Sequence, residues 1–126
     1  MASPKKILIV DDEPDMVEWL KTFFEDNGFI TVFAYNGEDG FSKARSEKPD
    51  LITLDVSMDK QSGIKCYRNL CDTNETSKIP VVMVTGVAAD FKRFIESRKQ
   101  VPKPAGYFEK PVEPDELLKK VRQLVG

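Results

Sequence analysis

The stretch Lys6-Ile7-Leu8-Ile9-Val10-Asp11-Asp12 places four branched apolar residues directly before two carboxylates. A continuous apolar run of this length is typical of a strand that is buried on both faces of a parallel sheet. Similar runs occur at 51–54 and 79–84, and each is again followed by a polar residue. None approaches the roughly 20 apolar residues that a membrane-spanning helix needs. The pattern therefore predicts a sheet of buried strands and no membrane insertion.

Apolar residues at helical spacing fill the intervals between these runs. Met16, Val17 and Leu20, for example, recur at intervals that place them on one face of a helix. Strands that alternate with helices indicate a doubly wound α/β domain, in which right-handed crossovers place helices on both faces of a five-stranded parallel sheet. The predicted strands are 6–10, 29–35, 51–54, 79–84 and 107–108, and the predicted helices begin near Pro14, Glu38, Ser62, Ala88 and Pro114.

Two helices carry details that the structure can test. Gly40 lies inside the second predicted helix, where glycine costs up to about 1 kcal/mol relative to alanine. The start of that helix is therefore the least well defined by the sequence. The last helix is predicted to bury Leu117, Leu118, Val121, Leu124 and Val125 on one face.

Composition limits the function classes that the chain can serve. Its 126 residues predict a single domain over 1–126, and the net charge of −2 argues against direct binding of nucleic acid. The chain has no histidine, which excludes Ser-His-Asp catalysis and histidine metal ligands. Cys66 and Cys71 form no CxxC pair and are compatible with a reducing cytoplasm. Because the chain ends just after its last helix, we expect no output domain.

Chemically active side chains follow four of the five predicted strands. Asp11 and Asp12 follow the first strand, Asp55 the third, Thr85 the fourth and Lys110 the fifth. The carboxyl ends of parallel strands meet at one edge of the sheet, where ligands bind in this architecture. Three converging carboxylates repel one another, and Mg²⁺ is a hard cation that relieves this repulsion by binding oxygen ligands. The arrangement predicts a magnesium site.

A metal held by few protein oxygens leaves positions open for a phosphate group. Lys110 would supply positive charge for the phosphoryl oxygens, Thr85 would donate a hydroxyl, and Asp55 would act as a nucleophile that forms an aspartyl phosphate. Each residue also has a simpler interpretation. A carboxylate after a strand can cap a helix, a threonine can bond to the backbone, and a lysine can lie in solvent. The coincidence of all these residue types at one edge favours the phosphoryl site.

Four motifs resemble the receiver domain of two-component response regulators, and together they extend over essentially the whole chain. They are 7–14 (ILIVDDEP), 54–58 (LDVSM) with Gly63, 84–86 (VTG) and 107–111 (YFEKP). The resemblance implies a flavodoxin-like strand order 2-1-3-4-5. It also implies a cytoplasmic signalling domain that is not a turnover enzyme, with Mg²⁺ as its cofactor and no separate cofactor-binding residues.

The resemblance assigns a role to each residue at the predicted edge. Asp55 would be the phosphoacceptor. Asp12, Asp55 and the backbone carbonyl of Ser57 would ligate Mg²⁺, and Asp11 would assist through metal-bound water. Lys110 would pair with the phosphoryl oxygens.

The resemblance further implies a conformational response and protein partners. Thr85 and Tyr107 would form a switch pair that remodels the surface built by the fourth helix, the fifth strand and the fifth helix. A sensor histidine kinase or a phosphotransfer domain would donate the phosphoryl group, and the expected docking surface is the first helix around Met16, Val17 and Leu20, with the loops around Asp55. The same apolar residues are expected to lie partly in the core. A downstream protein would receive the output, and a phosphorylation-dependent dimer is compatible with this scheme.

Other protein classes make different demands on the sequence. A haloacid-dehalogenase-like phosphatase needs a second aspartate two residues after its nucleophile, where this chain has Glu13. A flavodoxin needs a Ser/Thr-rich phosphate loop after the first strand, and the acidic stretch here would repel a flavin phosphate. The remaining alternative is a receiver-like scaffold that binds a partner without being phosphorylated.

Overall fold

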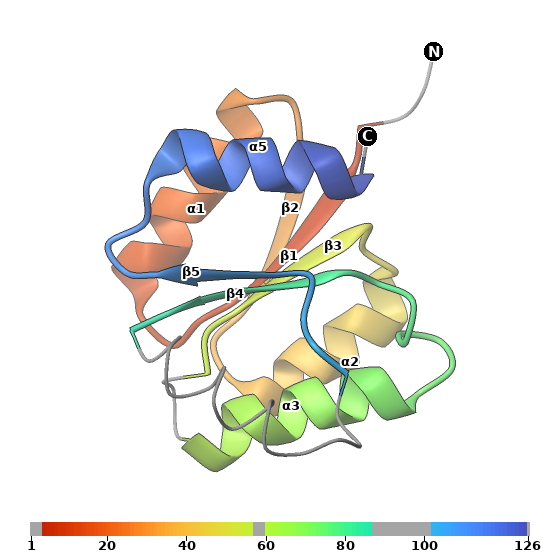
Figure 1. The fold of residues 1–126 in the computed structure, drawn as a ribbon. Helices are drawn as coiled ribbons and strands as arrows, with labels where there is room; N and C mark the ends of the chain where they lie inside the picture. The colour runs from red at the N-terminus through yellow and green to blue at the C-terminus, as the bar shows by residue number, and fades with distance from the viewer. Residues whose placement is uncertain (1–3, 57–59, 87–101, 126) are drawn as a thin grey trace.

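The computed structural model describes residues 4–56, 60–86 and 102–125, and within these ranges it contains five strands and four helices (Figure 1). The helix predicted over 88–98 lies outside the described residues. None of the helices described is long and apolar enough to span a membrane. The elements are β1 (Lys6–Val10), α1 (Pro14–Asp26), β2 (Ile30–Ala34), α2 (Gly37–Glu47), β3 (Leu51–Leu54), α3 (Lys60–Asp72), β4 (Val81–Thr85), β5 (Gly106–Glu109) and α5 (Pro114–Val125).

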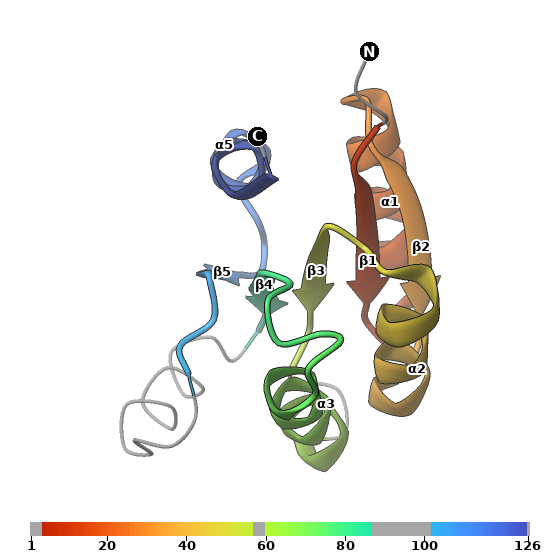
Figure 2. The ribbon, with the colours of Figure 1, turned by 90° about the vertical axis from the view of Figure 1, so that its right-hand side faces the viewer.

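All five strands are parallel, in the order β2-β1-β3-β4-β5, which confirms the predicted architecture. From β1 the chain first moves outward to β2 and then returns to the other side of β1 to form β3. Helices α1 and α5 lie on one face of the sheet, and α2 and α3 lie on the other (Figures 1 and 2). The reversal at β1 and β3 creates the position at which doubly wound sheets bind their ligands.

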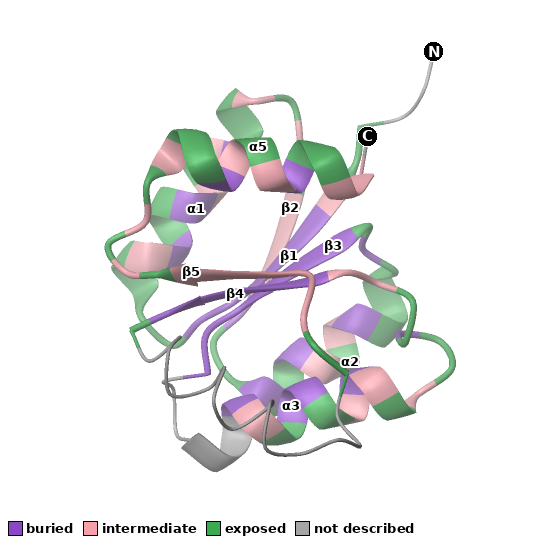
Figure 3. Ribbon diagram, in the orientation of Figure 1, coloured by how far each residue is buried: buried purple, intermediate pink, exposed green. Residues whose placement is uncertain are grey.

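The alternation of side chains along the strands builds two separate apolar cores. Ile7 and Ile9 face α1 and α5, whereas Leu8 and Val10 face α2 and α3. A central strand is therefore apolar at most positions, with Thr53 of β3 and Thr85 of β4 as buried polar exceptions, and β1, β3 and β4 are buried almost throughout (Figure 3). This two-sided burial explains the continuous apolar runs in the sequence.

Helix α1 bears on one prediction about partners. Val17 and Leu20 are only 2% and 1% exposed because they pack into the core beneath α1. Val17 and Leu20 therefore belong to the core, as the sequence predicted in part, and cannot themselves present a docking surface, while docking of a partner at α1 stays a prediction. The aromatic residue that α1 does expose is Trp19, which is 40% exposed and stacks on the ring of Phe23.

Helix α5 corrects one prediction. Leu117 and Val121 are buried, and Leu124 and Val125 pack against the same core, as expected. Leu118 is half-buried and belongs to neither core. The apolar stripe of α5 is narrower than its sequence suggests, which leaves Leu118 at the surface.

Several element boundaries also differ from the prediction by one or two residues, among them the starts of the fourth strand and of the second helix. The fourth strand begins at Val81 rather than at Ile79, because the backbone N–H of Ile79 bonds to the carbonyl of Thr76 in a turn. Helix α2 begins at Gly37, where Asn36 caps the helix by accepting a hydrogen bond from the backbone N–H of Asp39 at 2.8 Å.

Gly40 is required where α2 crosses β1. A Cβ atom at this position would lie 2.9 Å from each of the two methyl carbons of Val10. Both methyl groups are buried in the core on the α2 and α3 side of the sheet, so they have little room to move. The close approach of α2 to the sheet therefore explains a glycine that helix propensity alone disfavours.

We expect the substitution Gly40→Ala to lower the free energy of unfolding by about 1–2 kcal/mol, because overpacking outweighs the roughly 1 kcal/mol gained in helix propensity. Urea unfolding monitored by circular dichroism measures this change. Ser42→Ala, at an exposed position of the same helix, serves as the matched control and should not lower stability. An unchanged or higher stability of the Gly40 variant would contradict the steric explanation.

Candidate functional site

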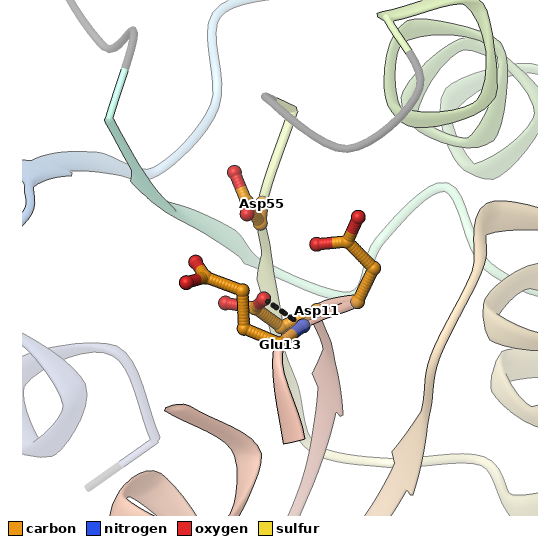
Figure 4. A group of neighbouring side chains, drawn as sticks. Asp11, Glu13 and Asp55 are labelled. Carbon is orange, nitrogen blue, oxygen red and sulfur yellow. Dashed lines mark hydrogen bonds between the residues drawn. The ribbon is translucent and has the colours of Figure 1, made fainter. Parts of the chain in front are cut away.

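Two buried carboxylates lie at the carboxyl edge of the central strands. Asp11 follows β1 and Asp55 follows β3, and the two residues are 1% and 2% exposed. The backbone N–H of Asp11 bonds to the carbonyl of Ala34, and that of Asp55 bonds to the carbonyl of Val10 at 2.9 Å. These bonds continue the sheet beyond the strand ends and hold both acids at the same edge (Figure 4).

Four acidic side chains gather at this edge. Asp11, Asp12, Glu13 and Asp55 each offer a carboxylate oxygen, and these oxygens lie within 4.8 Å of one another. Asp11 and Asp55 are buried, while Asp12 and Glu13 are exposed, so the cluster has a closed inner side and an open outer side. This set of hard oxygen donors fits Mg²⁺, which binds through a few carboxylates and keeps several water molecules.

Lys110 occupies the centre of the acidic cluster. Its Nζ atom lies 2.6 Å from Glu13 Oε1, 2.9 Å from Asp11 Oδ2 and 3.1 Å from Asp55 Oδ2. The residue directly follows β5, where its backbone N–H bonds to the carbonyl of Thr85. The ammonium group donates hydrogen bonds to Glu13 and Asp55 and is in ion-pair contact with Asp11.

Burial and charge shift the pKa values of this group. Burial raises the pKa of Asp11 to about 6, and the charge of Asp55 adds to this effect. Hydrogen bonds from the backbone N–H of Glu13 and from Lys110 oppose it. Burial by itself would lower the pKa of Lys110, but the hydrogen bonds to Glu13 and Asp11 and the charges of Asp11 and Asp55 outweigh burial and raise it.

The other predicted site residues lie at varying distances from the acidic cluster. Thr85 is fully buried at the end of β4 and contacts Lys110 through the backbone hydrogen bond. Tyr107 pairs with Met83 in the sheet and packs, half-buried, against the core on the α2 and α3 side. Ser57 lies outside the described residues. The structure thus brings Asp11, Asp12, Asp55 and Lys110 together and places Thr85 beside them.

Glu13 is a member of the cluster that the sequence interpretation missed. It is the N-cap residue of α1, yet its side chain makes no capping hydrogen bond and contacts Lys110 instead. The alternative interpretation, in which an acid after a strand caps a helix, holds in part for Asp11, because one of its oxygens accepts a hydrogen bond from the backbone N–H of Glu13 at 2.9 Å. No local pattern signals the contact of Glu13, because its partner is 97 residues away in the chain.

Gly63 permits α3 to pack closely behind Asp55. A Cβ atom at Gly63 would lie 2.7 Å from the Cα of Val56 and 3.1 Å from the carbonyl oxygen of Asp55. Any side chain at Gly63 would displace the backbone that carries Asp55. The absence of a side chain at Gly63 therefore allows the buried carboxylate of Asp55 to keep its position.

Comparison with known proteins agrees with this geometry. The family model of the response regulator receiver domain matches residues 7–122. PilH of Pseudomonas aeruginosa is 35% identical over 121 residues, which cover 96% of this chain and 98% of that protein. The transcriptional regulatory protein PhoP of Bacillus subtilis, which acts in alkaline phosphatase synthesis, is 33% identical over 96% of this chain but only 48% of its own length.

Solved structures show the same fold. The chemotaxis protein CheY4 of Vibrio cholerae matches with a TM-score of 0.83 and 25% identity, covering 96% of this chain and 98% of that one. The receiver domain of the sensor histidine kinase PA1611 of Pseudomonas aeruginosa, solved with magnesium in its active-site cleft, matches with a TM-score of 0.84 and 19% identity, covering 98% of both chains. The chain described here belongs to the receiver-domain family of response regulators, the signalling domains of two-component systems.

Proposed function

We propose that this chain is a phosphorylation-dependent switch that accepts a phosphoryl group on Asp55 in a Mg²⁺-dependent reaction. The observation that supports this most directly is the position of the Asp55 carboxylate, which is buried among other acids and lies 3.1 Å from the ammonium group of Lys110. A nucleophile and a cation are thus held at the open edge of a rigid sheet. Both groups are needed for phosphoryl transfer.

Asp12, Asp55 and the backbone carbonyl of Ser57 would hold Mg²⁺, with Asp11 acting through metal-bound water. The clustering of four carboxylates within 4.8 Å supports this assignment. When bound, the metal supplies positive charge that stabilises the phosphoryl oxygens during transfer. The remaining chemistry comes from side chains of this chain.

In the transfer step, an oxygen of Asp55 attacks the phosphorus atom of a phosphohistidine. A P–O bond forms and the P–N bond breaks, and the departing imidazole keeps the electron pair and takes up a proton. Lys110 pairs with the phosphoryl oxygens, and Thr85 donates its hydroxyl hydrogen to one of them. The chain contains no histidine, so the donor is another protein, either a sensor histidine kinase or a phosphotransfer domain.

The output of the switch would be a changed surface over β5 and α5, together with segment 88–98, which lies outside the described residues. Lys110 is joined to Thr85 by a backbone hydrogen bond, so capture of a phosphoryl group by Lys110 acts directly on the end of β4. Thr85 pairs with Glu109 in the sheet, and Tyr107 lies two residues before Glu109 on β5. Tyr107 would therefore respond to a movement of Thr85. We infer a cytoplasmic signalling domain, not a turnover enzyme, that controls a downstream protein.

We expect the wild-type protein to gain the mass of one phosphoryl group when incubated with Mg²⁺ and acetyl phosphate, and Asp55→Asn to gain none. Intact-protein mass spectrometry measures both outcomes. Asp26→Asn, at an exposed acid on α1, is the control and should be labelled like the wild type. Absence of labelling in the folded wild-type protein would instead support the unphosphorylated scaffold.

The raised pKa of Asp11 makes Mg²⁺ binding depend on pH. Below its pKa of about 6 the carboxyl group carries a proton that the metal must displace, whereas above it the carboxylate is already charged. The affinity for Mg²⁺ should therefore rise about tenfold between pH 5 and pH 7 and change little above pH 7. Isothermal titration calorimetry measures this dependence.

Asp11→Asn provides the control for the pH experiment. This variant should bind Mg²⁺ more weakly at pH 7, and its affinity should vary less between pH 5 and pH 7 because the titrating group is gone. If the variant shows the same pH dependence of Mg²⁺ affinity as the wild type, Asp11 is not the group that causes it.

A further inference from the structure

Glu13 makes the shortest of the three carboxylate contacts of Lys110. Its Oε1 atom lies 2.6 Å from Lys110 Nζ, compared with 2.9 Å for Asp11 and 3.1 Å for Asp55. A charge-assisted hydrogen bond of this length is stronger than a neutral one. In this structure Glu13 therefore helps to determine where the ammonium group of Lys110 lies.

The three carboxylates differ in how easily they can leave Lys110. The side chains of Asp11 and Asp55 are 2% and 1% exposed, so separating either from Lys110 would leave a buried charge without its partner. The side chain of Glu13 is 61% exposed and can turn into water without such a penalty. Of the three contacts, that of Glu13 is the most readily released.

The position of Glu13 also matters to an incoming phosphoryl group. Lys110 donates hydrogen bonds to Glu13 and Asp55 and forms an ion pair with Asp11. A phosphoryl oxygen that approaches from the open side of the cluster therefore competes with Glu13 for Lys110. Glu13 belongs to the open outer side of the cluster, where an anionic donor must approach. Its negative charge repels the same anion that Lys110 attracts.

We propose that Glu13 is a positioning residue that holds Lys110 before phosphorylation and competes with the phosphoryl group for it. The effect is to slow phosphorylation by small anionic donors, because the donor must displace Glu13 before it can use Lys110. The effect on the rate of phosphorylation rests on the proposed function. The contact between Glu13 and Lys110 can be measured without metal or phosphoryl donor.

The first experiment uses the full chain without Mg²⁺ and without a phosphoryl donor. Nitrogen-15 NMR of the lysine ammonium groups, with Lys110 assigned by its loss in Lys110→Arg, reports hydrogen exchange at Nζ. Glu13→Gln replaces the charge-assisted hydrogen bond by at most a weaker neutral one, which should speed this exchange at least about threefold. Glu18→Gln, which removes an equal charge from an exposed position on α1, should leave it unchanged. Equal exchange in the wild type and Glu13→Gln would overturn the proposal.

The second experiment measures the rate of phosphorylation by acetyl phosphate at saturating Mg²⁺. Glu13→Gln should react about threefold to tenfold faster than the wild type, with a weaker dependence on ionic strength, because one repelling charge is absent. Glu18→Gln should match the wild type in both respects. A rate in Glu13→Gln that equals the wild-type rate or falls below it would overturn the competition.

The two experiments separate this inference from the proposed function. If the wild-type protein gains no phosphoryl group, the proposed function fails. The exchange measurement then decides by itself whether Glu13 holds Lys110. A change in exchange without a change in rate would support the contact and refute the competition.

Discussion

The ammonium group of Lys110, placed among the carboxylates of Asp11, Glu13 and Asp55, is the interaction on which the site depends. Two of these acids are buried, and burial raises the free energy of an unpaired charge. The lysine neutralises part of this charge and keeps the carboxylates together at one edge of the sheet. The same requirement for positive charge makes the edge suitable for a metal ion and a phosphoryl group.

The arrangement of the sheet explains why these residues meet. Parallel strands end at a common edge, so residues that follow β1, β3 and β5 come together although they are far apart in the chain. The two apolar cores enclose the central strands. Close packing at Gly40 brings α2 against the side chain of Val10, and close packing at Gly63 brings α3 against the backbone of Asp55 and Val56. Backbone geometry therefore brings the charged residues to one edge, where the contacts of Lys110 hold their side chains together.

Several features could be predicted from local patterns because they follow from local physics. Continuous apolar runs predicted the buried strands, and polar residues at their ends predicted the edge at which Asp11, Asp55 and Lys110 meet. The differences arose where two elements touch. Val17 and Leu20 are covered by the sheet, and Leu118 lies beside the stripe that α5 buries, because the width of a buried stripe depends on how the helix is seated.

The sequence by itself determined the alternation of strands and helices, the parallel sheet and the types of chemical group at its edge, because these follow from periodicity and from the direction of the chain. Only the tertiary structure decided that Glu13 leaves its helix uncapped to contact Lys110, and that Gly40 must be a glycine. Both depend on distances between residues that are remote in sequence, and a spacing along the chain does not encode such distances.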